Sequence, residues 1–281
     1  MQKNSKKIAV VYHGDCPDGF SGAWAARKKL GNKAEYIPAS DRHNPPEGLE
    51  GREVYLIDFT YAVPVMEKLK LQAKRLVAID HHISQQESVK VAHEHSFALN
   101  HSGAVLAWEY FNPKKKMPKL LNYVEDYDIW NFRHSASMPV HALIESTSFT
   151  FKNWDKLAAD LDKPATAKRR ISEGKIVLGL FDKILERLLG YAEKVVFEGF
   201  EIMAVNSPVL NDQLGNILCK KHPPLAIVWR KEHNHIHVSL RSDGSVDVSK
   251  LAAKFGGAGH RAASGFSLGK DQPLPWRPAK K

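Results

Sequence analysis

The sequence predicts an α/β protein made of a parallel-sheet domain and a smaller α/β domain, joined by a long helix. In the first half, short apolar runs alternate with helical segments, which is the pattern of parallel strands linked by right-handed crossovers. A long amphipathic tract follows, and after Gly199 the pattern changes to short strands. The chain has 281 residues, enough for two domains that each bury a core.

The parallel-sheet domain is expected to contain three apolar strands. We place them at residues 8–12, 54–57 and 76–79, and helices at 19–30, 64–74, 102–111 and 119–127. The three strands stop at His13, Asp58 and Asp80. The carboxyl ends of the strands therefore lead into polar residues.

The tract from 166 to 198 predicts the connecting helix. Its apolar residues recur at helical spacing; they are Ile176, Leu180, Ile184, Leu188 and Leu189. Beyond it we expect strands at 201–206, 225–229 and 235–241, a helix at 248–255 and a glycine-rich turn. These elements place the first domain at residues 1–195 and the second at 196–281.

Composition and charge indicate which partners and which cellular location to expect. The formal net charge is +10 and the pI is near 9.4, which favours a polyanionic partner, although solubility alone can explain a basic chain. No apolar run reaches the roughly 18 residues of a membrane span, and the N-terminus lacks the apolar stretch of a secretory signal. Cys16 and Cys219 lie far apart and suggest no disulfide framework. We therefore expect a cytoplasmic protein with no membrane partner.

Acidic and imidazole side chains follow each predicted strand. They are His13, Asp15 and Asp18 after the first, Asp58 after the second, and Asp80, His81 and His82 after the third. A lone Asp after a strand is often a cap or turn residue, but ligands of an open parallel sheet bind where the carboxyl ends of its strands meet. Left without cations, such a cluster would repel itself or shift its pKa values. Oxygen and imidazole ligands suit manganese or magnesium, and two cations about 3.5–4 Å apart would activate water and neutralise a phosphoryl group.

The sequence resembles the DHH phosphoesterases, which are named for a motif that reads Asp80-His81-His82 here. Four further motifs follow the family's order: His13-Gly14-Asp15-Cys16-Pro17-Asp18-Gly19, then Asp58, then Glu125-Asp126-Tyr127-Asp128-Ile129-Trp130, and finally residues 256–266, which resemble the DHH-associated C-terminal domain. The first motif has one extra residue relative to the family. That insertion leaves the placement of Asp15 and Asp18 open and makes Cys16 an alternative ligand.

The resemblance implies a site for two Mn²⁺ ions, with Mg²⁺ or Co²⁺ as alternatives. One ion would be held by His13, Asp15 and Asp58. The other would be held by Asp18, Asp58, His81 and Asp128, with Asp126 as the alternative to Asp128. His82 is expected to contact the phosphate, and Asp80 to orient the histidines.

The resemblance also implies that the active site lies in the cleft between the domains and that the glycine-rich segment holds the nucleotide end of the substrate. The expected substrate-binding residues are His101, Arg241, Gly257, Gly259, His260 and Arg261. A glycine-rich turn after a helix can instead be a simple C-cap. Trp24, Trp108 and Trp130 are expected in the core rather than at a base-stacking surface.

The predicted function is a metal-dependent phosphodiesterase that hydrolyses short RNA or DNA, or linear and cyclic dinucleotides, through a metal-bound hydroxide. A small-phosphate hydrolase such as a pyrophosphatase would use the same metal ligands. A non-catalytic nucleotide or RNA binder is the alternative from another class. A homodimer remains an open alternative to a monomer.

Overall fold

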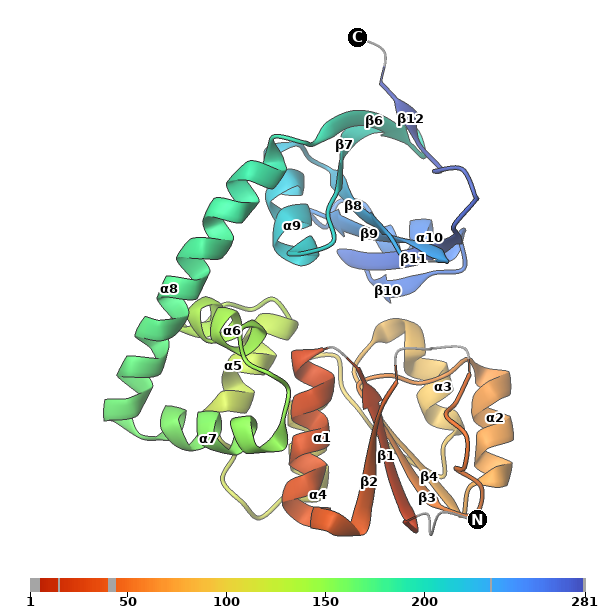
Figure 1. Cartoon of the computed structure of the whole chain (residues 1–281). Coiled ribbons are helices and arrows are strands. Elements are labelled where there is room, and N and C mark those ends of the chain that lie inside the picture. Colours follow the sequence, from red (N-terminus) through yellow and green to blue (C-terminus); the bar gives the residue numbers. More distant parts are fainter. Residues whose placement is uncertain (1–5, 15, 40–43, 233, 280–281) are drawn as a thin grey trace. The chain divides into compact units, whose positions relative to one another are not determined.

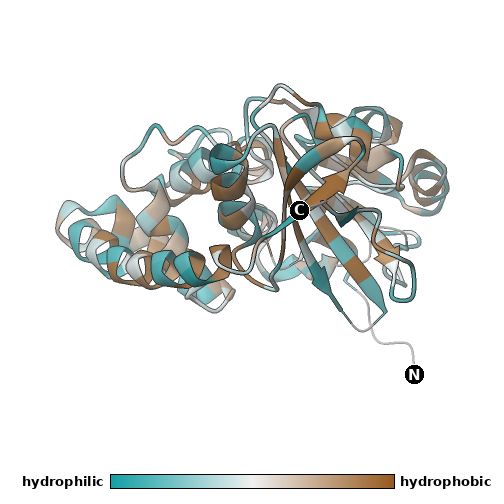
Figure 2. Ribbon diagram, turned by 90° about the horizontal axis from the view of Figure 1, so that it is seen from above, coloured by the Kyte–Doolittle hydropathy of each residue, from teal (hydrophilic) through white to brown (hydrophobic). Residues whose placement is uncertain are grey.

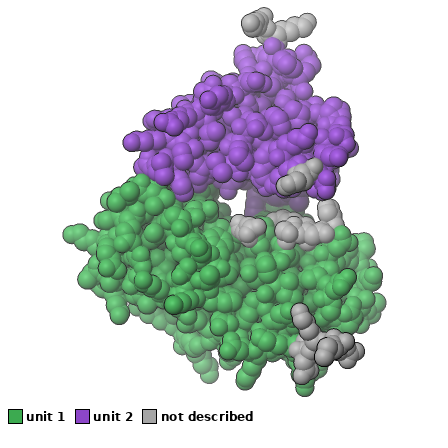
Figure 3. Space-filling view, in the orientation of Figure 1, with its two compact units in different colours: residues 1–178 green, residues 179–281 purple. Residues whose placement is uncertain are grey.

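The computed structural model describes residues 6–14, 16–39, 44–232 and 234–279. The chain divides into two compact units, residues 1–178 and 179–281 (Figure 3). The division falls within α8, a 26-residue helix over Pro164–Leu189. The predicted boundary at residue 195 lies beyond the end of this helix and stays a prediction.

The first unit contains a parallel five-stranded sheet in the order β2-β1-β3-β4-β5 (Figure 1). The strands are β1 (Ile8–His13), β2 (Ala34–Ala39), β3 (Glu53–Ile57), β4 (Arg75–Asp80) and β5 (Glu94–Phe97). The three predicted strands are the central ones, which are buried on both faces and hence read as apolar runs. The edge strands β2 and β5 were not predicted, because β2 buries only its two end residues and β5 buries none.

Helices cover both faces of this sheet. They are α1 (Pro17–Leu30), α2 (Val63–Gln72), α3 (Gln86–Val91) and α4 (Gly103–Phe111), with short 3-10 turns η1 (Gly31–Lys33) and η2 (Ile83–Gln85). Alternate residues of each strand enter two separate cores, as expected for extended chains. Val10 and Ile57 pack with Trp24 of α1, whereas Val11 and Leu56 pack with Met66 of α2.

A helical layer follows the sheet in sequence. It consists of α5 (Lys119–Asp128), α6 (Ser137–Glu145), α7 (Phe151–Asp162) and the start of α8. Trp24 and Trp108 are buried as predicted. The prediction for Trp130 is wrong: it follows the end of α5 in a loop, and 36% of its surface is exposed.

The connecting helix is confirmed over Pro164–Leu189 as α8, but the predicted tract reached residue 198, and its last part is the strand Glu193–Phe197 instead. The predicted apolar face of the helix is also partly wrong. Ile176 and Leu180 are 77% and 56% exposed. One close contact is made at Gly174, where a Cβ atom would lie 2.0 Å from the carbonyl oxygen of Pro139 in α6. Figure 2 shows hydrophobic and hydrophilic residues side by side along the helices at its left, α7 and α8.

The second unit contains a mixed seven-stranded sheet in the order β10-β11-β9-β8-β7-β6-β12. Its elements are β6 (Glu193–Phe197), β7 (Phe200–Asn206), α9 (Asn211–Lys221), β8 (Leu225–Lys231), β9 (His235–Ser242), α10 (Val248–Ala253), β10 (Ala258–His260), β11 (Ala263–Gly269) and β12 (Arg277–Pro278). Only β7 and β8 pair in parallel. The α/β character predicted for this part of the chain is confirmed.

Among the described residues, no helix combines the length and the apolar character needed to cross a bilayer.

Candidate metal centre

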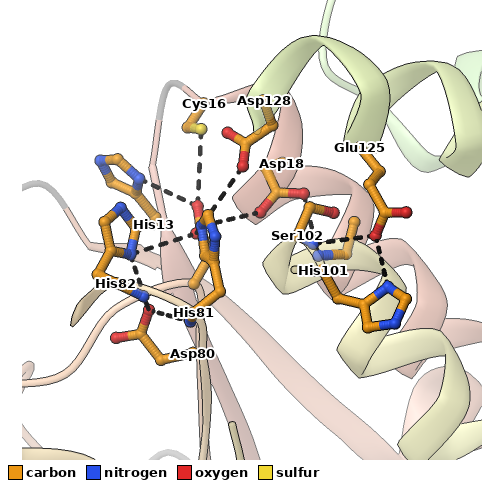
Figure 4. Close-up of polar contacts among 12 residues, drawn as sticks. His13, Cys16, Asp18, Asp80, His81, His82, His101, Ser102, Glu125 and Asp128 are labelled. Atoms are coloured by element: carbon orange, nitrogen blue, oxygen red, sulfur yellow. Dashed lines mark hydrogen bonds and ion pairs between the residues drawn. The ribbon is translucent and has the colours of Figure 1, made fainter. Parts of the chain in front are cut away.

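The site forms where the carboxyl ends of β1, β3 and β4 meet. From β1 the chain passes to β2 on one side and then to β3 on the other, so the strand order reverses between β1 and β3. Ligands of open α/β sheets bind at such a switch point. His13 ends β1, Asp58 follows β3 and His81 follows β4. The structure thus brings together residues that the sequence separates widely (Figure 4).

One group of potential ligands consists of His13, Cys16 and Asp58. Their ligand atoms lie within 4.8 Å of one another. His13 Nδ1 is 3.2 Å from Asp58 Oδ2, and the Cys16 thiol is 3.6 Å from the same oxygen. Asp15, the third predicted ligand here, lies outside the described residues.

A second group surrounds the His81 ring. Its Nε2 lies 3.3 Å from Asp58 Oδ1 and 3.4 Å from Asp128 Oδ2. Asp18 Oδ2 lies 3.9 Å from the same nitrogen. Asp58 therefore presents one carboxylate oxygen to His13 and the other to His81. A carboxylate placed in this way can serve two ligand groups, and the predicted pair of ions stays a prediction.

The backbone at Asp58 is unusual. Its φ is 65°, in the left-handed region that non-glycine residues rarely adopt, although Asp tolerates it better than most. Its N–H donates to the carbonyl of Ile79 at 2.9 Å, which ties the residue to β4. Strained backbone of this kind persists where the surrounding structure fixes it and gathers at functional sites.

The charges of the site are strongly coupled. Burial, together with the nearby charges of Asp128 and Asp58, raises the pKa of Asp18 well above its usual range. Burial also raises the pKa of Asp128 to about 6, partly offset by His81. Burial alone would raise the pKa of Asp58, but the rings of His13 and His81 hold it well below its usual value. Burial likewise opposes the charge on His81, yet the surrounding carboxylates raise the pKa of His81 to about 10.

Buried carboxylate oxygens without a hydrogen bond test whether this set of residues fits a cation. Asp18 Oδ2, Asp58 Oδ1 and Asp128 Oδ2 accept no hydrogen bond from any residue that the structure describes, and all three face the single nitrogen His81 Nε2. Buried oxygens without a hydrogen-bond donor are costly. Ligands about 2.1 Å from one cation lie about 3–4 Å from each other, and the distances around His81 Nε2 are 3.3–3.9 Å. The residues therefore fit a divalent cation.

The N-terminus of α4 fixes the position of Asp18. The Ala104 amide donates to Asp18 Oδ1 at 3.0 Å, which leaves Oδ2 directed at His81. A Cβ atom on Gly103 would lie 2.9 Å from Asp18 Oδ2 and 2.8 Å from the Cβ of Asp58. Only glycine lets the helix approach the acidic residues this closely. Gly103 is not among the site residues predicted from the sequence, although its place directly after a serine N-cap is a visible signal.

Glu125 holds the start of α4 from the opposite side. Its Oε2 accepts from the amide of Ser102 and lies 3.0 Å from His101 Nδ1. Ser102 in turn caps the helix by accepting from the Val105 amide. His101, predicted to bind substrate, thus lies beside Glu125 rather than among the potential metal ligands. The sequence assigned no role to Glu125, because this contact joins segments more than 20 residues apart.

The carboxylate of Asp80 contacts three nitrogen atoms of the next two residues, His81 and His82. Its Oδ1 accepts from the amides of His81 and His82 at 2.7 and 3.1 Å and lies 2.7 Å from His82 Nδ1. These contacts fix the His82 ring, which is 21% exposed at the site. The arrangement suits a residue that orients His82, while the functional roles of both residues stay predictions.

Asp126, the alternative to Asp128, lies outside both groups of potential ligands. Its carboxylate accepts from the amides of Arg133 and His134 and from the Ser137 hydroxyl, at 2.8, 3.0 and 2.5 Å. Both oxygens are therefore occupied by donors from the loop after α5 and from Ser137, the first residue of α6. The geometry favours Asp128 as the ligand.

The predicted substrate-binding residues of the second unit have structural partners of their own. Arg241 donates to Asp212, and Arg261 Nε donates to the carbonyl of Gly244 at 3.3 Å. The carbonyl of His260 accepts from the Ser264 hydroxyl at 2.6 Å.

The glycines beside these residues allow β10 to pack against β11. A Cβ atom on Gly257 would lie 2.2 Å from the carbonyl oxygen of Gly265. One on Gly259, whose φ is +142°, would lie 2.6 Å from that of Ala263. Close packing thus accounts for both glycines, and their part in substrate binding stays a prediction.

Comparison with known sequences identifies one domain and two relatives. Residues 199–275 match the model of the DHHA1 domain. An uncharacterized protein of Acanthamoeba polyphaga mimivirus is 29% identical over 283 residues, covering 92% of this chain and 67% of that protein. Oligoribonuclease NrnB of Bacillus subtilis is 25% identical over 168 residues, covering 57% of this chain and 41% of NrnB. The chain thus spans less than half the length of NrnB.

Solved structures share the fold at low sequence identity. The DHH domain of a member of a ribosomal protein family has a TM-score of 0.62 at 14% identity, covering 94% of this chain and 83% of that one. An exopolyphosphatase-related protein from Bacteroides fragilis has a TM-score of 0.55 at 16% identity, covering 96% and 89%. RecJ from Thermus thermophilus in complex with Mn²⁺ has a TM-score of 0.50 at 13% identity, covering 94% and 50%. The α/β fold predicted from the sequence is that of these proteins.

Proposed function

We propose that this chain, a DHH-family protein with a DHHA1 domain, is a metal-dependent phosphodiesterase that acts on short oligonucleotides or on linear or cyclic dinucleotides. The observation that carries the proposal is the shared carboxylate of Asp58, which lies 3.2 Å from His13 on one side and 3.3 Å from His81 on the other. Many enzymes that transfer or hydrolyse phosphoryl groups use two cations bound side by side.

In this proposal one ion would be held by His13, Asp15 and Asp58. The second would be held by Asp18, Asp58, His81 and Asp128. When bound, the two ions supply Lewis-acid activation of water and neutralise charge at the phosphate. Nitrogen and oxygen ligands suit Mn²⁺, with Mg²⁺ or Co²⁺ as alternatives, and the Mn²⁺ complex of RecJ is consistent with that choice.

Cys16 is a poor ligand in this scheme. The other proposed ligands are nitrogen and oxygen donors, which suit manganese or magnesium, whereas a thiolate selects softer metals. We therefore assign Cys16 to the wall of the site, beside the Asp58 oxygen that it contacts at 3.6 Å.

The protein's own groups would bind and orient the substrate. We assign His82 to a non-bridging phosphate oxygen and Asp80 to holding the His82 ring in position. We also assign His101, Arg241, Gly257, Gly259, His260 and Arg261 to the remainder of the substrate. Arginine can bind phosphate through two parallel hydrogen bonds, which supports Arg241 and Arg261 in this role.

NrnB is named an oligoribonuclease, so short RNA is the first substrate to test. The formal net charge of +10 would attract such a polyanion. Cys16 and Cys219 are both thiols, which is compatible with the cytoplasmic location that we propose. Both a monomer and a homodimer are compatible with this proposal.

The decisive experiment compares the wild-type protein with Asp58→Asn and with a matched control, Asp243→Asn, on the exposed β9–α10 turn. The substrates are RNA of two to five nucleotides, a linear dinucleotide, cyclic dinucleotides and pyrophosphate, each with Mn²⁺ and again with a chelator. We expect metal-dependent release of mononucleotides, reduced about 1000-fold or more in Asp58→Asn and unchanged in Asp243→Asn. Circular dichroism checks that both variants fold.

Other outcomes would select another function. Turnover of pyrophosphate alone would indicate a small-phosphate hydrolase. Nucleotide binding without turnover of any substrate would indicate a binding protein. Turnover that survives chelation, or survives Asp58→Asn, would contradict the proposed two-cation site.

A further inference from the structure

Two aromatic side chains, Trp130 and Phe132, lie exposed in the loop directly after Asp128. Their exposed fractions are 36% and 37%, unlike those of Trp24 and Trp154, which are almost fully buried. The ring centroids of Trp130 and Phe132 are 4.8 Å apart at an interplanar angle of 72°. The buried ring of Tyr127 lies beneath both, at 5.3 and 5.9 Å. The pair is thus a supported aromatic surface.

The backbone of this loop is strained at both aromatic residues. The φ angles of Trp130 and Phe132 are 60° and 50°, in the left-handed region. Bulky side chains rarely adopt this conformation, and they persist in it only where the surroundings fix it. A loop held in this way at two residues is more consistent with a function than with a chance turn.

Asp126 fixes the strained loop. Its carbonyl accepts from the amides of Asn131 and Phe132 at 3.0 and 3.2 Å. Its buried carboxylate accepts from the amides of Arg133 and His134 and from the Ser137 hydroxyl. One residue therefore receives five hydrogen bonds from residues 131–137, and the aromatic pair is set before any ligand binds.

The loop adjoins the candidate metal centre through the chain itself. Asp128 ends α5 and lies 3.4 Å from His81. Trp130 follows two residues later, so its Cα lies within about 7.6 Å of that of Asp128. A molecule with a phosphate at the metal centre and a flat apolar group nearby could contact both.

We propose that a nucleobase of the substrate stacks on the exposed ring of Trp130, with Phe132 packed against that ring at 72° to hold it as a platform; this inference rests on the proposed function. A nucleotide combines the phosphate that the metal centre requires with a planar base. Stacking on aromatic side chains tolerates any base, because each base has a π-face. The platform therefore selects nucleotide phosphodiesters over base-free ones and provides little discrimination among sequences.

The test uses the Mn²⁺-loaded full chain and four variants: Trp130→Ala, Trp130→Phe, Phe132→Ala and the control Tyr191→Ala. Tyr191 is an aromatic residue that is 74% exposed and lies between α8 and β6. Each is assayed with a linear dinucleotide and with its abasic analogue, a phosphodiester of two ribose units that carries no aromatic ring. We expect KM for the dinucleotide to rise about tenfold or more in Trp130→Ala and Phe132→Ala. KM for the base-free diester should stay within about twofold, Trp130→Phe should retain most of the affinity and Tyr191→Ala should match the wild type.

A separate binding measurement separates this inference from the proposed function. Calorimetric titration with a nucleoside monophosphate and with ribose 5-phosphate requires no turnover. Weaker binding of the nucleotide alone in Trp130→Ala supports the platform even if no substrate is hydrolysed. Hydrolysis of the dinucleotide with an unchanged KM in Trp130→Ala, or an equal loss for both diesters, overturns the platform and leaves the proposed function standing.

Discussion

Gly103 lies so close to Asp58 that a Cβ atom on the glycine would come within 2.8 Å of the Asp58 Cβ. The same atom would lie 2.9 Å from Asp18 Oδ2. The first residue of α4 is thus packed against two of the proposed metal ligands, and the position of the helix and the geometry of the site depend on each other.

The first prediction follows from this contact. Gly103→Ala should destabilise the metal-free protein by about 1–3 kcal/mol, because the added methyl group overpacks a buried site. It should also weaken Mn²⁺ binding by about 10- to 100-fold, as changes to groups that hold metal ligands in position typically do. Urea denaturation and calorimetric Mn²⁺ titration measure the two effects.

Gly179→Ala is the matched control. A Cβ atom at this position of α8 would meet nothing within 4 Å. Alanine is the better helix former, so this variant should gain about 0.5–1 kcal/mol and bind Mn²⁺ as the wild type does. If both substitutions had the same effect, close packing of Gly103 would not be the cause.

A second prediction separates Asp126 from Asp128. Asp126→Ala should cost about 2–4 kcal/mol of stability with or without metal, because it leaves the amides of Arg133 and His134 and the Ser137 hydroxyl without their acceptor. Asp128→Ala should leave the stability of the metal-free protein within about 1 kcal/mol, because relief of the burial of this carboxylate and of its repulsion by Asp58 offsets the lost attraction to His81.

Thermal unfolding with chelator and with Mn²⁺ measures the difference. In the wild type, Mn²⁺ at 100 times its dissociation constant should add about 2.7 kcal/mol. Asp128→Ala should lose most of this gain. A variant at Asp126 that folds stably but gains nothing from Mn²⁺ would instead favour Asp126 as the ligand.

The third prediction concerns pH. Burial lowers the pKa of His141 to about 3, well below the ordinary value near 6.5 that applies in the unfolded chain. The ring of His141 stacks on that of Tyr127 with 3.3 Å between the ring centroids, and Glu145 Oε1 lies 3.8 Å from His141 Nε2. Between these two pKa values the unfolded state binds a proton that the folded state does not, so stability falls as the pH is lowered from about 6 towards 3.

His141→Gln removes this titration. With chelator present, the wild type should lose about 1.4 kcal/mol more per pH unit than the variant over this range. Urea denaturation at pH 6, 5 and 4 provides the comparison. Parallel stability curves for the two proteins would rule out a buried, neutral His141.

The strands that could be predicted from the sequence are those whose apolar residues form one continuous run. β1, β3 and β4 are buried on both faces, so each forms a continuous apolar run. β2 and β5 are edge strands with few buried residues, and their composition resembles that of loops. The exposure of Trp130 could not be read from its spacing either, because the turn after α5 depends on the hydrogen bonds that Asp126 accepts.

The candidate site was predictable to a similar extent. The residues at the strand ends could be named because parallel strands bring their carboxyl ends to one edge of the sheet. Glu125 could not, since its role arises only when α4 packs beside α5. Gly103 could be noticed as a glycine after a serine N-cap, but its contact with Asp58 arises only in the folded structure. The different contacts of Asp126 and Asp128 likewise depend on the direction of each side chain at the end of α5.

The parallel sheet also has a consequence for how the protein matures. Every pairing in a parallel sheet joins segments distant in the chain, so such sheets fold slowly. The proposed ligands extend from His13 to Asp128, and Asp18 is oriented only after α4 has docked. A partly folded chain would thus offer scattered carboxylates rather than a site, and cations would bind tightly only to molecules whose first unit is complete.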